Sequence, residues 1–273
     1  MRQQTHQQGF TLVEMVMVIV VMGVIGGIVA VFMKSPIDAY VDSGRRAALT
    51  DVADTAVRRM ARDIHKALPN SLRTPTTTPA NQCIEFIPTK TGGRYRADVD
   101  GSGNGDILDF TTADGSFDML GANSALTDQA IVAGDLVAVY NLGITGSDAY
   151  NADNTSAVTS VGVGSLGSET KINITSKQFP LASGSNRFHV IPNGENVVAY
   201  VCSGGSLRRT TRAFAGASCP ATGTILANNV GTCTFVYNGS DLQRNALVQL
   251  SITFTDSGET VSLYHEVHVN NTP

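Results

Sequence analysis

The feature that most constrains the fold is an apolar run near the amino terminus, Phe10–Met33 (FTLVEMVMVIVVMGVIGGIVAVFM). Of its 24 residues, 19 are apolar, and the exceptions are Thr11, Glu14 and three glycines. As a helix the run would be about 36 Å long, enough to cross the ~30 Å hydrocarbon core of a bilayer. A core helix of a globular domain is seldom apolar on every face. The run therefore predicts a membrane-spanning helix.

The run differs from an ordinary secretory signal, whose apolar part is short and ends in a small-residue cleavage site. Here Ser35, Pro36 and Ile37 lead directly into a further helical pattern. The residues before the run, Met1–Gly9, are polar and carry one certain cation, Arg2. We expect one membrane pass, with Arg2 on the short side and the carboxyl-terminal body on the other.

One acid, Glu14, lies within the apolar run. A bare charge at the centre of a membrane costs roughly 2.5–3.5 kcal/mol, so such a residue usually marks a partner or a pathway. A structural alternative is that Glu14 lies near the headgroups and extends its carboxylate to water. The functional alternative needs a nearby cation.

The segment Gly9-Phe10-Thr11-Leu12-Val13-Glu14, followed by the apolar helix, resembles the class III signal of type IV pilins and of the pseudopilins of type II secretion. The resemblance implies that a prepilin peptidase cleaves between Gly9 and Phe10 and methylates the new amino terminus of Phe10. It also implies that Glu14 docks subunits. Cleavage creates an ammonium that the Glu14 of a neighbouring subunit can neutralise in a low dielectric. Many major pilins have a proline within this helix, whereas this run contains glycines instead.

The same resemblance implies a location and a set of partners. The precursor would be a single-pass inner-membrane protein with a cytoplasmic amino terminus and a periplasmic carboxyl-terminal domain, and would later enter a filament at the cell surface. The implied partners are the prepilin peptidase, other major and minor pilin or pseudopilin subunits, the inner-membrane assembly platform and the lipid bilayer. A net charge of −4 offers no basic surface for duplex DNA, so we expect no nucleic-acid partner.

Beyond Pro36, apolar residues recur every three or four positions, as on one face of an amphipathic helix. They are Ile37, Tyr40, Val41, Ala48, Val52, Ala56, Met60, Ile64 and Ala67. The helix is expected to end at Leu68, because a residue before proline is pushed out of the helical region. The expected division is a leader at 1–9, the membrane half of the helix at 10–33, its amphipathic half at 34–68 and a periplasmic β-rich domain at 69–273.

From Pro69 onward, short strand patterns alternate with turns rich in Gly, Asn, Asp and Ser. Apolar and polar residues alternate most clearly at 248–255 and 261–269. Further strands are expected at 83–87, 136–140, 171–175, 188–191, 197–202 and 232–237, and surface loops at 98–130 and 143–170. We expect an α+β, pilin-like fold, in which one long amino-terminal helix packs on an antiparallel β-sheet-rich globular domain.

Four other segments resemble minor pilin-like subunits of the mannose-sensitive haemagglutinin (MSHA) pilus: the helix exit at 67–71, CIEF at 83–86, GGRYR at 92–96 and VHVNN at 267–271. These pieces are less specific than the amino-terminal motif. The J-type minor pseudopilin of type II secretion has the same architecture and is one alternative. A membrane-tethered periplasmic enzyme or binding domain is an alternative of another class. The chain shows no nucleophile elbow, Walker loop or zinc-protease helix, so an enzyme is not expected.

Four cysteines follow the apolar run and would face an oxidising periplasm. Sequence alone allows three pairings. We favour Cys202–Cys219, which closes a short turn-rich loop, and that leaves Cys83–Cys233. No CxxC pair is present to indicate a zinc site.

The segment 98–109 has the spacing of an EF-hand calcium loop, with Gly103 at position 6. The oxygen-bearing side chains at positions 1, 3, 5, 7, 9 and 12 are Asp98, Asp100, Ser102, Asn104, Asp106 and Asp109. Position 12 is Asp rather than Glu, and no helix precedes the loop. We therefore favour a polar turn and keep calcium, which occurs among pseudopilins, as the alternative. No other cofactor is expected.

Two weaker motifs are interpreted structurally. Gly162–Gly167 matches GxGxxG, but it leads into an expected strand rather than a helix, so we expect a flexible loop. His265 and His268 are three residues apart in an expected strand and so face opposite sides. His265 shares a face with Leu263 and Val267 and is expected to be partly buried.

Overall fold

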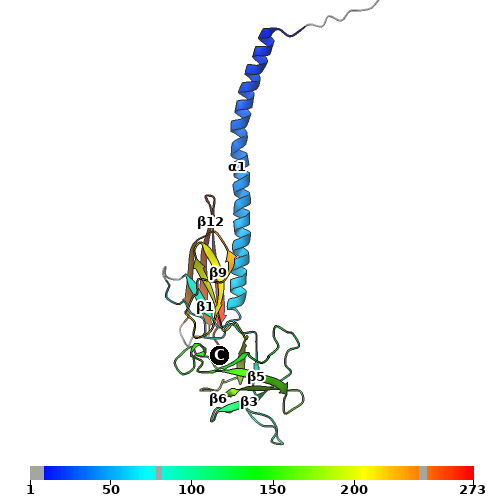
Figure 1. Cartoon of the computed structure of the whole chain (residues 1–273), viewed down its shortest axis with the longest axis vertical. Coiled ribbons are helices and arrows are strands. Elements are labelled where there is room, and N and C mark those ends of the chain that lie inside the picture. Colours follow the sequence, from blue (N-terminus) through cyan, green and yellow to red (C-terminus); the bar gives the residue numbers. More distant parts are fainter. Residues whose placement is uncertain (1–8, 78–81, 240–244) are drawn as a thin grey trace, which may run out of the picture. The chain divides into compact units, whose positions relative to one another are not determined.

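The computed structural model describes residues 9–77, 82–239 and 245–273. The chain forms two compact units, residues 1–49 and 50–273. One α-helix, α1 (Leu12–Ile64), runs through the boundary between them, and every described strand belongs to the second unit (Figure 1). This arrangement confirms the predicted α+β, pilin-like fold, with one long apolar helix and a domain of antiparallel sheets.

Helix α1 ends four residues earlier than the sequence predicted. Its last helical residue is Ile64, because the chain that follows pairs with the segment after the first strand. The Leu68 N–H donates to the carbonyl of Ile87 at 2.7 Å, and Ala67 forms an antiparallel bridge with Pro88. This pairing replaces the last helical turn.

The part of α1 in the second unit buries one face. Its buried residues are Ala53, Ala56, Val57, Met60 and Ile64, and Met60 and Ile64 are fully buried. Val52 was expected on this face but remains exposed. The buried stripe therefore includes the neighbouring Ala53 instead.

The strands divide into three antiparallel sheets. They are β1 (Cys83–Phe86), β2 (Thr91–Arg94), β3 (Asp114–Met119), β4 (Leu136–Val139), β5 (Thr155–Val163), β6 (Thr170–Lys177), β7 (Arg187–Ile191), β8 (Val197–Ser203), β9 (Ser206–Arg212), β10 (Thr224–Ala227), β11 (Val230–Asn238), β12 (Asn245–Asp256) and β13 (Glu259–Asn270). The strand orders are β1-β8-β9-β10, β11-β12-β13 and β2-β7-β4-β5-β6-β3.

The six-stranded sheet closes on itself. Its two end strands, β2 and β3, are joined by backbone hydrogen bonds from Arg96 to Asp118 (2.8 Å) and from Leu120 to Arg94 (2.9 Å). The resulting barrel encloses an apolar core that includes Phe117, Val137, Ile172, Phe179 and Phe188.

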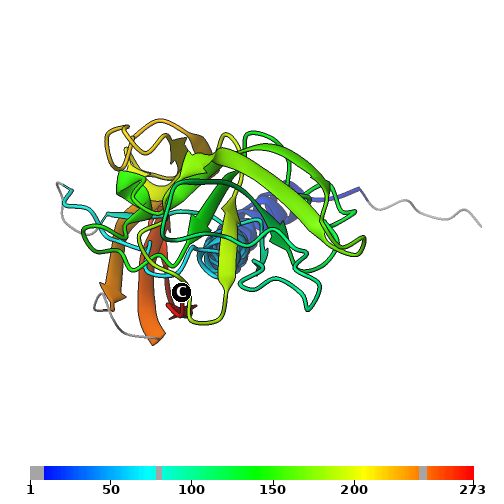
Figure 2. The ribbon, with the colours of Figure 1, turned by 90° about the horizontal axis from the view of Figure 1, so that it is seen from below.

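The barrel is an insertion between two neighbouring strands of the remaining framework. Strands β1 and β8 are neighbours in one sheet, yet the whole barrel, β2 to β7, lies between them in sequence. In Figure 1 the barrel strands β3, β5 and β6 lie at one end of this unit, and β1, β9 and β12 at the other. Figure 2 separates the green barrel strands from the orange β12 and β13.

Polar contacts fix the barrel to the framework. The Asn70 side chain, just after α1, donates to the carbonyls of Asn141 (2.9 Å) and Asn271 (3.2 Å). Asn141 in turn donates to the carbonyl of Pro69 at 2.7 Å. The helix exit thus binds both the barrel and the last residues of the chain.

The expected loops hold two strands that the sequence did not reveal. Strand β3 lies within 98–130 and β5 within 143–170, and both belong to the barrel. Gly162 and Val163 are part of β5, so the start of the GxGxxG segment is strand rather than flexible loop. Six expected strands, together with the hairpin of β12 and β13, are confirmed with small changes at their ends.

Candidate processing and assembly site

The amino-terminal motif lies at the start of α1. The Thr11 hydroxyl accepts a hydrogen bond from the backbone N–H of Glu14 at 3.3 Å. In return, the Glu14 carboxylate accepts from the backbone N–H and the hydroxyl of Thr11, both at 3.2 Å. This reciprocal arrangement is a capping box, and it places a carboxylate at the positive end of the helix dipole. The motif therefore also sets where the helix begins.

The predicted cleavage junction is accessible. Gly9 and Phe10 are both exposed, Phe10 to 81%. A side chain built on Gly9 would meet nothing within 4 Å apart from its own neighbours. The peptide bond between the two residues is therefore open to an approaching enzyme. Arg2 lies outside the described residues.

The apolar run is exposed along its whole length. Every residue from Phe10 to Met33 is exposed, and an 18-residue window of α1 has a mean hydropathy of 2.9 with none of it buried. Burial of apolar surface contributes about 25 cal/mol per Å², so this helix gains much by entering lipid or a bundle of similar helices. By length and composition α1 can cross a membrane. Glu14 would then carry the one acidic group within the span.

The disulfide pairing predicted from the sequence, Cys202–Cys219 and Cys83–Cys233, is wrong. The structure joins Cys83 to Cys219 and Cys202 to Cys233, with Cα–Cα distances of 6.1 and 6.3 Å. The reason is the face that each partner reaches: Cys83 lies opposite Val201, one residue from Cys202, and Cys219 lies on the face of Cys83 whereas Cys233 lies on that of Cys202. Because side chains alternate along a strand, Cys83 and Cys202 point to opposite faces of the sheet.

Each face supplies its own cysteine partner. On one face, Cys83 lies with Ala199, Val201 and Cys219 in a small apolar cluster. On the other, Cys202 joins β8 to β11 through Cys233. One disulfide therefore holds the loop between β9 and β10, and the other ties two sheets together.

A buried ion-pair cluster, which sequence reasoning missed, lies beside Cys83. The fully buried carboxylate of Glu85 binds the guanidinium groups of Arg73 (2.6 Å) and Arg212 (2.8 Å). The same guanidinium groups lie 3.6 and 5.8 Å from the ring centroid of Tyr150. Burial alone would raise the pKa of Glu85, but the hydrogen bonds from Arg212 and Arg73 outweigh it and the pKa lies below its ordinary value. Arg212 is 127 residues from Glu85, so no local pattern could reveal the cluster.

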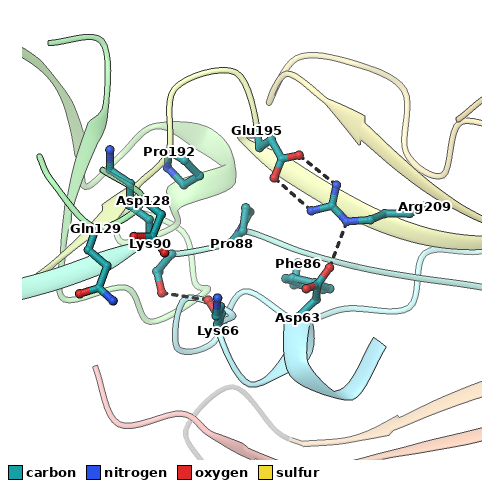
Figure 3. A pocket seen from close by; sticks show the side chains of 11 residues that line it. Asp63, Lys66, Phe86, Pro88, Lys90, Asp128, Gln129, Pro192, Glu195 and Arg209 are labelled. Carbon is teal, nitrogen blue, oxygen red and sulfur yellow. Dashed lines mark hydrogen bonds and ion pairs between the residues drawn. The ribbon is translucent and has the colours of Figure 1, made fainter. Parts of the chain in front are cut away.

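A second charged group lies at the end of α1, beside a cavity of about 270 Å³ (Figure 3). Asp63 accepts hydrogen bonds from Arg209 (3.0 Å) and from the hydroxyl of Tyr200 (2.6 Å). Arg209 also binds both carboxylate oxygens of Glu195, at 2.9 and 3.0 Å. Burial, followed by the bond to Asp63, raises the pKa of Tyr200. These contacts attach the helix end to β8 and β9.

The calcium-loop residues are brought into separate interactions. The Asp100 carboxylate caps its own turn by accepting two backbone N–H groups at 2.8 Å each. Asp106 pairs with Lys171 at 2.9 Å. Asp109 accepts bonds from the threonines that follow it, which lower its pKa to about 2. Within the described ranges, no three His, Cys, Asp or Glu side chains form a group that could hold a metal ion. The acids of the 98–109 loop therefore form no such group in the part of the chain that the structure describes.

The two histidines of β13 are both exposed. The expectation that His265 would be partly buried is wrong. On the same face of β13, Leu263 is partly buried and Val267 is fully buried. Burial on β13 therefore increases toward its carboxyl-terminal end.

Comparison with protein families gives one match, to the prokaryotic N-terminal methylation motif at residues 4–30. The chain thus carries a type IV pilin-like class III signal, and this signal implies processing by a prepilin peptidase and pilin assembly. No curated protein and no solved structure matched the chain.

Proposed function

We propose that this chain is a minor subunit of an MSHA-type type IV pilus, of the MshO type, and serves as a structural subunit rather than an enzyme. The precursor would be anchored in the inner membrane, cut after Gly9 and methylated at Phe10. It would then assemble through α1, with its body on the periplasmic side and later in the filament. The resemblance of the segments at 67–71, 83–86, 92–96 and 267–271 favours the MSHA type.

One observation carries this proposal. The methylation motif at residues 4–30 includes the start of helix α1, and every residue of the apolar run Phe10–Met33 is exposed. A lone membrane anchor needs the apolar length, but it does not need an accessible Gly9–Phe10 junction or an acid four residues further on. Filament assembly uses all three features, because the released ammonium of one subunit can pair with the Glu14 carboxylate of another.

The body supports a specialised rather than a repeating role. The inserted barrel adds residues 91–191 to the β1–β8 framework and carries most of the long exposed loops. We propose that it presents these loops to other minor subunits or to the outside, near the start or tip of the filament. A J-type minor pseudopilin would share the same chemistry at α1. Genes for an MSHA pilus or for a secretin-based secretion system beside this gene would distinguish the two.

The first test separates processing from assembly. Gly9→Val should leave an uncut precursor, visible as a larger band on a gel. Glu14→Ala should be cut normally but should enter filaments poorly. A matched control is Asp38→Ala, which removes an exposed acid from the same helix outside the apolar run. Normal filament incorporation of both the Gly9 and Glu14 variants would contradict the proposal and favour a membrane-tethered enzyme or binding domain.

The capping box allows a sharper version of this test. Glu14→Gln keeps a side chain that can still accept the Thr11 hydrogen bonds, because glutamine also serves in capping boxes. It removes only the charge. If charge pairing between subunits is needed, Glu14→Gln should fail in incorporation as Glu14→Ala does. Normal incorporation of Glu14→Gln would mean that Glu14 acts by starting the helix instead.

A further inference from the structure

The loop between β9 and β10, residues 213–223, is shaped by one arginine. The Nη1 group of Arg212 donates to the carbonyls of Ala213 (2.9 Å), Phe214 (2.9 Å) and Gly216 (3.1 Å). Its Nη2 and Nε groups bind the two carboxylate oxygens of Glu85, at 2.8 and 3.3 Å. A single guanidinium therefore curls the loop and fixes it to β1.

Glu85 also reaches the cysteine of that loop. The backbone N–H of Cys219 and the hydroxyl of Ser218 each donate to the Glu85 carboxylate at 3.4 Å. Glu85 is two residues from Cys83 on β1, so both side chains project from the same face of the sheet. The carboxylate thus lies where it can bring Cys219 toward Cys83.

The entropy of loop closure disfavours the observed Cys83–Cys219 bond relative to bonds with nearer cysteines. Cys219 is 136 residues from Cys83 but only 17 from Cys202 and 14 from Cys233. If loop closure alone decided, the short Cys202–Cys219 loop would form roughly 20 times more readily than the long one. Hydrogen bonds to charged groups contribute roughly tenfold or more each in an equilibrium constant. The bonds of Glu85 are therefore large enough to reverse this preference.

We propose that Glu85 and Arg212 are positioning residues for disulfide formation, holding the 213–223 loop so that Cys219 is oxidised with Cys83 rather than with a nearer cysteine. The role is independent of the place of this protein in a filament. It requires the Glu85–Arg212 contact to form before the bond closes.

The oxidation itself is ordinary thiol–disulfide exchange with a disulfide oxidant. One cysteine thiolate attacks the S–S bond of the oxidant and releases a thiolate. The second cysteine thiolate then displaces the remaining oxidant sulfur, which forms the Cys83–Cys219 bond. The oxidant is reduced to two thiols, the two cysteines are oxidised, and the two protons that the cysteine thiols lose end on the two thiolates released from the oxidant. Glu85 and Arg212 take no part in the electron transfer and only set which sulfurs meet.

The test is the disulfide connectivity of the full-length chain after reoxidation. The protein is reduced and denatured, then refolded in detergent micelles with oxidised and reduced glutathione. The bonds are identified by mass spectrometry of peptides at several quenched time points. For Glu85→Gln and Arg212→Lys, we expect the ratio of Cys83–Cys219 to non-native bonds to fall about tenfold relative to wild type, the effect of one lost charged hydrogen bond. The additional non-native bonds should be Cys202–Cys219 or Cys219–Cys233.

A matched control separates positioning from general destabilisation. Glu195→Gln breaks a similar bidentate pair, with Arg209, on the opposite face of the same sheet. It should leave the connectivity within about twofold of wild type. Native pairing at the wild-type ratio in both the Glu85 and Arg212 variants would overturn the proposal, and so would equal mispairing in the Glu195 variant. The quenched time points report early bonds, so the result holds even for a variant that never completes folding.

Discussion

His189 should make the stability of the barrel depend on pH. It lies on β7, and its Nε2 atom is buried with no hydrogen-bond partner within the described part of the chain. Burial, followed by the positive charge of Arg187, lowers the pKa of His189 from 6.5 to about 4. The folded state therefore keeps this imidazole neutral at pH values where the unfolded chain would bind a proton.

The sign follows from that difference. Between about pH 6.5 and pH 4 the unfolded state binds more protons, so the free energy of unfolding falls as the pH is lowered through this window. One pKa unit corresponds to about 1.36 kcal/mol. His189 should therefore lower the free energy of unfolding by roughly 2–2.5 kcal/mol when the pH falls from about 7 to 4.5. Above about pH 7.5 the residue is almost entirely neutral in both states and contributes little to the slope.

The measurement compares wild type with His189→Gln, which cannot be protonated in this range. Because the chain has no tryptophan, urea unfolding is followed by the near-ultraviolet circular dichroism of its tyrosines. The loss of stability on acidification should be smaller in the variant by roughly 2 kcal/mol. Carboxylates contribute equally to both proteins and cancel in the difference.

A second histidine serves as the control. His65, just after α1, is exposed to solvent, so His65→Gln should leave the pH dependence close to that of wild type. If His189→Gln lost as much stability as wild type between the two pH values, the argument from burial would fail. An equal effect of His65→Gln would trace the slope to histidine in general rather than to the buried site.

Three further predictions concern packing and the acidic loop. Met60→Ala should lower the free energy of unfolding by about 2–5 kcal/mol, because Met60 is fully buried, whereas Val52→Ala on the exposed side of α1 should change it by less than about 1 kcal/mol. Equal effects in urea unfolding would mean that the buried face of the helix is wrongly assigned. Gly93→Ala should lower the free energy of unfolding by about 1–3 kcal/mol, because the new Cβ would lie 2.7 Å from a methionine sulfur of the barrel core. A Cβ at Gly115 would meet nothing within 4 Å, so Gly115→Ala should leave the free energy of unfolding almost unchanged. A stable Gly93 variant would argue against the closed barrel. Calorimetric titration with calcium should give no binding heat from the 98–109 loop, and a saturable signal abolished by removing its acids would revive the calcium interpretation.

The sequence revealed the elements that carry their own pattern. Residues 10–33 are apolar on every side, which only a helix in lipid or in a bundle satisfies. Strands β12 and β13 alternate apolar and polar residues, so the sequence alone predicts which of their residues face the core and which face solvent. The Gly9, Phe10 and Glu14 motif is local, and residues 4–30 match the methylation motif.

The features that were missed depend on partners far away in the sequence. Strands β3 (DGSFDM) and β5 (TSAVTSVGV) contain Asp, Gly and Ser, which are poor indicators of a strand, and they form because the closed barrel supplies neighbours on both sides. The disulfides were mispaired because only the folded structure shows that Cys219 reaches the face of the sheet that carries Cys83, whereas Cys233 reaches the face that carries Cys202. The Glu85 cluster joins residues from separate segments, so it has no sequence signature at all.

The long disulfide has a mechanical consequence. Cys83 and Cys219 are 136 residues apart, and the whole barrel lies between them. A tensile load applied between the two ends of the chain would pass through the sulfur–sulfur bond and bypass the barrel. The segment removed from the load could otherwise extend by roughly 450 Å at ~3.3 Å per residue. Cys202–Cys233 adds a second covalent crossing to the same framework. While both bonds are intact, pulling on the chain can therefore stretch the framework around the barrel but cannot unravel the barrel itself.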